Sequence, residues 1–138
     1  MLWEAQGLVY ECQHARRTTC AVRGGCRYLV EQLPHNLQAK HIGSQILRSG
    51  TAAAPNYAEA RAAESRADFV HKLKICLKEL NETSVWLRIL QRSIAIDADF
   101  ANGLVAENQE LCRILVASVQ TGRRNELSAK GKPTAGEN

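Results

Sequence analysis

The 138-residue sequence predicts an all-α protein, an up-and-down antiparallel four-helix bundle built as one domain. Three observations support this prediction. Aromatic residues make up only 5% of the chain, three prolines leave long uninterrupted stretches, and apolar residues recur at helical spacing. A core of aliphatic residues and alanine suits helix packing better than a β-sandwich, whose strands favour aromatic and β-branched residues.

The first helix is predicted over residues 18–33. It should end there because Pro34 pushes the residue before it out of the helical region. Gly24 and Gly25 weaken this helix, since each glycine costs about 1 kcal/mol relative to alanine. Residues 1–17 show no sustained apolar period. They are therefore interpreted as a poorly defined N-terminal segment.

The second helix is predicted to begin after Asn36, a residue that caps helices well. Gly50 and Pro55 interrupt it, and a proline inside a helix removes one backbone hydrogen bond and clashes with the preceding turn. We therefore expect a kink or a break near residues 50–55, with helix resuming through the alanine-rich segment that follows.

The third helix, over residues 69–94, has the clearest pattern. Its apolar residues are spaced alternately four and three apart, which is a heptad seam with one polar exception at Thr83. Ser65 and Asp68 have the form of a capping box just before it. The seam consists of Phe69, Leu73, Cys76, Leu80, Thr83, Leu87, Leu90 and Ile94.

A fourth helix is predicted to begin at Asp97 or Asp99 and to end at Gly122. Residues 123–138 have few apolar residues and are interpreted as a disordered tail, which leaves residues 18–122 for the bundle. The predicted seam of this helix, again at fours and threes, consists of Phe100, Leu104, Glu107, Leu111, Ile114 and Ser118.

The third helix has two further faces besides its seam. One is a largely apolar strip, which either forms an oligomer interface or widens the core of one bundle. The other is a row of cations without interleaved acids, which either contacts phosphates or is simply a solvated face. The strip consists of Ile75, Glu82, Trp86 and Ile89, and the row of Lys74, Lys78, Arg88 and Arg92.

No motif of enzymatic chemistry is found, and no cofactor, metal or small-molecule substrate is expected. A di-iron site needs Glu-x-x-His pairs, but neither Glu79 nor Glu107 is followed by histidine three residues later. Cys12, Cys20 and Cys26 could form a metal or thiol site, yet their irregular spacing favours free thiols. The sequence shows no membrane span and no secretory signal, so a cytoplasmic protein is expected.

Several segments within residues 29–125 have a recognisable order, among them 45–51, 54–60, 63–74, 77–83 and 110–115. In these segments the chain resembles a bacterial family of four-helix bundles first noticed in open reading frames within intervening sequences of 23S ribosomal RNA genes. Among the motif residues are Arg48, Asn56, Glu59, Asp68, Lys72, Glu79 and Glu82, which we interpret as a structural polar network within or between subunits. Two departures from the family's pattern are the first 20 residues and the Gly24-Gly25 pair.

The resemblance implies a bundle that assembles as a homopentamer and has no known enzymatic activity. A distantly similar bundle, the accessory protein of diversity-generating retroelements, is a basic pentamer that binds nucleic acid. Together with the net charge of +4, this favours a non-enzymatic bundle that binds structured RNA or other nucleic acid through the cation row. The alternative is a protein-interaction scaffold that does not bind nucleic acid.

Overall fold

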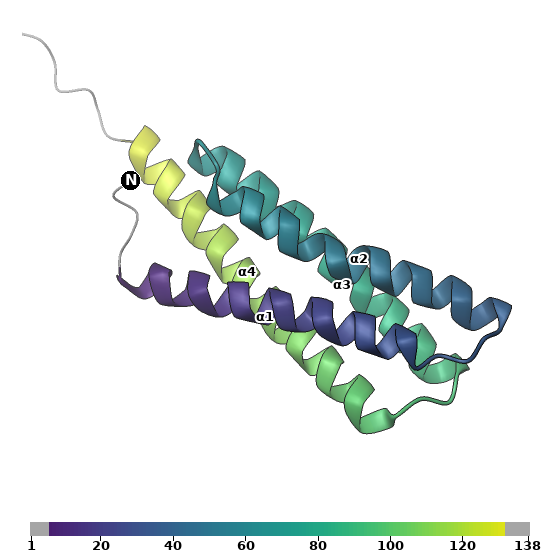
Figure 1. Ribbon diagram of the computed structural model, residues 1–138. Helices are drawn as coiled ribbons and strands as arrows, with labels where there is room; N and C mark the ends of the chain where they lie inside the picture. The colour runs from purple at the N-terminus through teal and green to yellow at the C-terminus, as the bar shows by residue number, and fades with distance from the viewer. Residues whose placement is uncertain (1–5, 132–138) are drawn as a thin grey trace, which may run out of the picture.

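The computed structural model describes residues 6–131, which form four helices joined by short connections. They are α1 (Gln6–Glu31), α2 (Leu37–Arg61), α3 (Arg66–Ser93) and α4 (Ala98–Lys130). Each helix contacts the next along the chain, and α1 also contacts α4, which closes the bundle (Figure 1). Short connections make successive helices antiparallel neighbours. The predicted all-α up-and-down bundle is confirmed.

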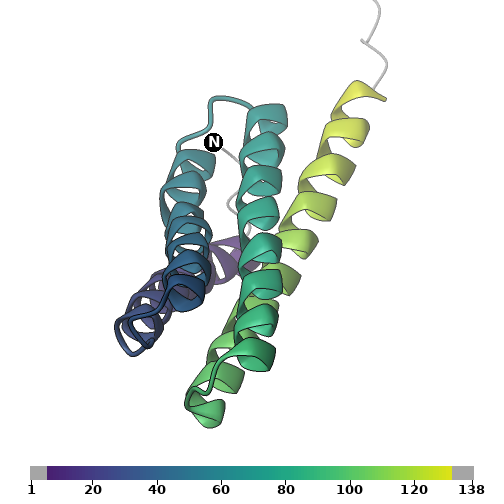
Figure 2. The ribbon, with the colours of Figure 1, turned by 90° about the vertical axis from the view of Figure 1, so that its right-hand side faces the viewer.

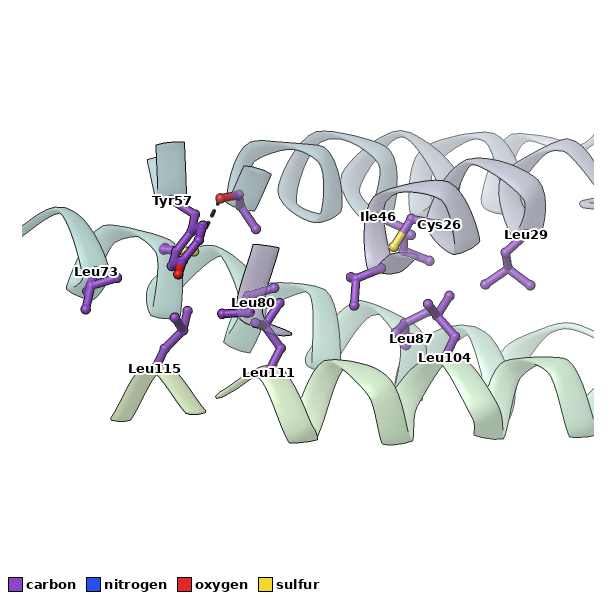
Figure 3. Close-up of a cluster of buried hydrophobic side chains, with 14 of the residues drawn as sticks. Cys26, Leu29, Ile46, Tyr57, Leu73, Leu80, Leu87, Leu104, Leu111 and Leu115 are labelled. Carbon is purple, nitrogen blue, oxygen red and sulfur yellow. Dashed lines mark hydrogen bonds between the residues drawn. The ribbon is translucent and has the colours of Figure 1, made fainter. Parts of the chain in front are cut away.

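The core lies on the axis of the bundle, and leucine is its commonest residue. Side chains from all four helices meet there, so no helix buries its apolar face against only one partner (Figure 3). The largest fully buried side chains include Leu29, Ile46, Leu73, Leu80, Leu87, Leu90, Leu111 and Leu115.

The heptad seam of α3 is confirmed from Phe69 to Leu90, because every predicted member in that stretch is buried. Thr83, its polar exception, is fully buried and hydrogen-bonded. Its hydroxyl lies 2.8 Å from the Ser49 hydroxyl of α2 and 2.8 Å from the Glu79 carbonyl oxygen, to which it donates. A buried hydroxyl with partners avoids the cost of an unmade hydrogen bond, so threonine fits the seam.

Three of the predicted helix starts are also confirmed. In each, a side-chain oxygen of the cap accepts a hydrogen bond from the backbone N–H three residues later, which satisfies one of the unpaired donors of the first turn. The pairs are Asn36 with Ala39 at 2.8 Å, Ser65 with Asp68 at 3.1 Å, and Asp97 with Phe100 at 3.0 Å.

The first helix begins at Gln6, twelve residues before the predicted start, so most of the N-terminal segment 1–17 is helical; residues 1–5 lie outside the described residues. Ala15 and Thr19 are both buried, and they extend the spacing of Val22 and Cys26 toward the N-terminus in steps of four and three. The Thr19 hydroxyl donates to the Ala15 carbonyl oxygen. Because alanine and threonine occupy these two seam positions, the helical period of apolar residues is weak in this part of the sequence.

The second helix is continuous across Gly50 and Pro55, so the predicted interruption is not a break. Pro55 is exposed, whereas Ala53 and Tyr57 on either side of it are buried in the core. Burial of residues on both sides of the proline offsets the lost backbone hydrogen bond and keeps the helix in one piece.

The seam of α4 differs from the predicted one at its centre. Glu107 is exposed, and the neighbouring Asn108 is fully buried in its place. The Asn108 amide donates to the Leu80 carbonyl oxygen at 2.9 Å and to the Ser84 hydroxyl at 2.6 Å, both on α3. Because these partners satisfy the amide N–H groups, asparagine occupies a position where apolar periodicity alone would not place it.

Helix α4 does not end at Gly122 but continues to Lys130, so the predicted disordered tail is wrong for residues 123–130; residues 132–138 lie outside the described chain. Gly122 allows a close approach to α3, since a Cβ atom there would lie 2.8 Å from a methyl group of Val70. Beyond it, the Arg66 guanidinium donates to the Asn125 carbonyl oxygen at 2.9 Å. Figure 2 shows this last part of α4 leaning away from α2 and α3.

Candidate nucleic-acid and subunit interfaces

The predicted cation row lies on the face of α3 that points away from the core. Its four side chains are exposed, and none forms an ion pair with another described residue. Asn81 and Val85, which lie between them along the helix, are exposed as well. At about 1.5 Å per residue, the row from Lys74 to Arg92 is about 27 Å long. Such a straight row of unpaired cations can contact several phosphates at once.

A polar network connects α2 to α3 beside this row. Arg48 donates to the carboxylates of Glu79, at 3.3 Å, and of Glu82. The hydrogen bond from Arg48 is the main cause of the lowered pKa of Glu82, and Lys78 adds a smaller attraction in the same direction. Because Arg48 is half exposed, solvent screens these pairs and they add little to stability.

A second pair links the same two helices nearer the α2–α3 connection. The Lys72 ammonium lies 2.7 Å from a carboxylate oxygen of Glu59, and this hydrogen bond is the main cause of the raised pKa of Lys72. Asn56 donates to the Ala52 carbonyl oxygen within α2. The family motif residues Arg48, Glu59, Lys72, Glu79 and Glu82 are thus paired within one chain, in line with the structural role inferred for them.

The predicted interface strip divides into a buried and an exposed part. The Trp86 ring packs edge-on against His41 of α2, with ring centroids 5.7 Å apart, and Trp86 also contacts the core. Its indole N–H donates to Glu82 at 3.4 Å. Ile75 is partly buried, whereas Ile89 is 37% exposed. Trp86 therefore widens the contact with α2, and Ile89 leaves an apolar edge at the surface.

Of the three cysteines that were considered as a metal or thiol site, the structure describes the side chains of Cys20 and Cys26. Cys26 is fully buried, and this burial raises its pKa to about 12. Cys20 is exposed, and the side chain of Cys12 lies outside the part of the chain that is described. Among the side chains that the structure describes, no group of three or more histidine, cysteine or carboxylate residues could hold a metal ion.

Helix α1 has a second basic surface that the sequence interpretation missed. Arg16, Arg17 and Arg23 are exposed, and Arg27 lies 3.2 Å from Glu31. Arg16 and Arg17 were not recognised as part of a helical face because residues 1–17 were not assigned to a helix, and Arg23 and Arg27 alone, inside the predicted helix, did not indicate one. Helices α1 and α3 are not neighbours in the described bundle, so this surface and the cation row lie on different faces.

These features define a class of protein: a small antiparallel four-helix bundle with cations on its outer helix faces. No helix in the described part of the chain is long and apolar enough to cross a membrane. The model of the family described as 23S rRNA-intervening sequence protein matches residues 12–117. The chain therefore belongs to the 23S rRNA-intervening sequence protein family.

A solved structure supports this assignment. The chain is similar to a Bacteroides thetaiotaomicron protein described as having unknown function and as a member of the S23 ribosomal protein family. The two share 31% sequence identity with a TM-score of 0.74, over 80% of this chain and 98% of that one. No curated protein matches the sequence.

Proposed function

We propose that the protein is a non-enzymatic, oligomeric bundle that binds structured RNA or other nucleic acid through the cation row of α3. The observation that supports this most directly is that Lys74, Lys78, Arg88 and Arg92 share one exposed face and form no ion pair within the described chain. The relative in Bacteroides is described as a member of a ribosomal protein family, so structured RNA is the first nucleic acid to test.

The chemistry of the row predicts how such binding would work. Lysine and arginine contact phosphates irrespective of sequence, whereas sequence is read at base edges or by stacking. No aromatic side chain lies among the four cations, so the row offers no stacking platform. We therefore expect recognition of a phosphate backbone with weak sequence preference, in which several subunits pool their cations.

Replacing all four cations with alanine is expected to weaken binding to an RNA hairpin and to flatten its salt dependence. Each phosphate contact contributes roughly 0.9 to the slope of log K against log salt concentration on duplex DNA, so up to about 3–4 should be lost per subunit engaged. Fluorescence anisotropy between roughly 50 and 200 mM salt measures both quantities.

The matched control removes four exposed cations elsewhere: Arg17, Lys40, Arg123 and Arg124. It changes the net charge equally and should retain most of the affinity. Equal losses in the two variants would show that only net charge matters. That result, or a wild-type protein that does not bind at low salt, would reject the proposal.

Assembly is the second part of the proposal, and the exposed edge of the α3 strip is the proposed contact between subunits. The homopentamer implied by the family resemblance predicts a solution mass of five protomers, measurable by light scattering. Ile75→Glu with Ile89→Glu should lower that mass without loss of helicity, because a buried unpaired carboxylate is costly. Val116→Glu on α4, at a position that is 43% exposed, is the control. An unchanged mass in the double variant would exclude this face.

The alternative function, a protein-interaction scaffold, is favoured by one observation. Val85 is 55% exposed in the middle of the cation row, and Ile89 adds apolar surface beside it. A scaffold would use this apolar surface and ignore nucleic acid. Loss of partner capture in Val85→Ser, with RNA binding absent from the wild type, would favour the scaffold.

A further inference from the structure

A pocket of about 380 Å³ lies between α1 and α2, away from the cation row of α3. Two arginines line it, one from each helix: Arg16 on α1 and Arg61 in the last turn of α2. Its volume is at the small end of the range for small-molecule sites. The remaining lining residues are Thr19, Cys20, Ala54, Tyr57 and Ala58.

The pocket combines an apolar floor with a positive rim. Ala54 and Ala58 have the smallest side chains that still carry a Cβ, so they leave space where larger residues would fill the contact between helices. Tyr57, which is almost fully buried, also lines the pocket. This floor suits the flat or apolar body of an organic molecule rather than a bare ion.

The rim is selective for negative charge. No acidic residue lines the pocket, and neither Arg16 nor Arg61 forms an ion pair with a described residue. Each guanidinium presents several N–H donors in a rigid planar fork that matches carboxylate and phosphate oxygens. One arginine can satisfy a carboxylate in bidentate fashion, whereas two arginines on opposite helices match a dianion with three terminal oxygens.

We propose that the α1–α2 pocket binds a phosphate monoester group, with Arg16 and Arg61 contacting its oxygens and the attached organic group lying over Ala54, Ala58 and Tyr57. The phosphate belongs either to a free nucleotide or to the 5′-phosphate end of a nucleic acid, and the chemistry at the rim is the same for both. The site does not depend on the cation row, which lies on a helix that is not a neighbour of α1.

Binding of adenosine 5′-monophosphate to the full chain tests the pocket by calorimetry at low salt, with adenosine as the control lacking the phosphate. Arg16→Gln with Arg61→Gln should weaken the affinity by at least about tenfold, because both charge-assisted contacts are lost. Arg17→Gln with Arg124→Gln removes the same charge outside the pocket and should leave the affinity within about twofold. The quadruple alanine variant of the α3 row should bind the nucleotide like the wild type.

Cys20 gives a second readout that does not depend on affinity measurements. Its thiol is exposed and lines the pocket, so an occupied pocket should slow its alkylation by iodoacetamide. Trypsin releases Cys20 in the peptide of residues 18–23, separate from every other cysteine, so mass spectrometry can follow it alone. Protection that disappears in the double arginine variant supports the site.

A short oligoribonucleotide with either a 5′-phosphate or a 5′-hydroxyl group distinguishes the two possible sources of the phosphate. Protection of Cys20 by the nucleotide assigns the pocket to free nucleotides, and protection by the 5′-phosphorylated strand alone assigns it to nucleic-acid ends. The proposal is overturned if adenosine binds as well as its monophosphate, if the 5′-hydroxyl strand protects Cys20 as strongly as the nucleotide or the 5′-phosphorylated strand does, or if no phosphate-containing probe binds at millimolar concentration.

Discussion

Replacing Leu80 with alanine is expected to lower the free energy of unfolding by about 3–4 kcal/mol. Leu80 is fully buried at the centre of the α3 seam, and Figure 3 shows it facing Leu111 of α4. Its backbone carbonyl oxygen also accepts the hydrogen bond from Asn108. Because that bond ties α3 to α4 at this level, the helices cannot easily close over the missing methyl groups, and the cavity adds to the lost burial.

Urea unfolding followed by circular dichroism measures this loss as a lower midpoint. Val85→Ala, on the exposed face of the same helix, is the control and should change stability by less than about 0.5 kcal/mol. All variants are compared at one protomer concentration, since assembly contributes to apparent stability. A loss below about 1 kcal/mol for Leu80→Ala would mean that this layer of the core repacks freely.

The sequence predicted α3 well because its seam is almost entirely apolar. Seven buried positions, from Phe69 to Leu90, follow the heptad spacing without a glycine or proline, and the Ser65 cap marks the start. In α1 the same spacing passes through Ala15 and Thr19, which contribute little to any apolar count. In α4 it passes through Asn108, whose burial depends on a hydrogen-bond acceptor on another helix. Whether a small or polar residue occupies a buried seam position depends on its contacts with other helices, and the sequence alone does not show those contacts.

The candidate sites also include features that the sequence predicts and features that depend on contacts between helices. Exposure of the α3 cation row could be predicted, because a face opposite a strong seam must point to solvent. Pairing of Arg48 with Glu79 and Glu82 could not, because the residues are more than thirty positions apart in the chain. The α1–α2 pocket was not foreseen either, since it needs both the unrecognised first turns of α1 and the small residues Ala54 and Ala58.

Gly50→Ala is expected to destabilise the bundle, although alanine is the better helix former. A Cβ atom at this position would lie 2.5 Å from the Cys26 sulfur and 3.1 Å from the Cys26 Cβ atom. Helix propensity favours alanine by about 1 kcal/mol, whereas overpacking a core costs about 1–3 kcal/mol. We expect the steric cost to exceed the gain in helix propensity, because Cys26 is fully buried and cannot move into solvent.

Gly24→Ala is the matched control, because a Cβ atom at this exposed position would meet no other atom within 4 Å. It should stabilise the protein by about 0.5–1 kcal/mol, so the two glycine substitutions should have opposite signs. Equal effects would show that close approach of α1 and α2 does not limit position 50.

A double-mutant cycle identifies the contact responsible. Cys26→Ala removes the sulfur atom but retains the Cβ atom, so it should relieve most of the clash in Gly50→Ala and leave a smaller strain at 3.1 Å. We expect the two substitutions to couple by at least about 1 kcal/mol, measured by urea unfolding of the four proteins. Additive effects would instead mean that α1 shifts as a whole to admit the new methyl group. Such a shift would also change the α1–α2 pocket, so alkylation of Cys20 in Gly50→Ala distinguishes a local clash from a moved helix.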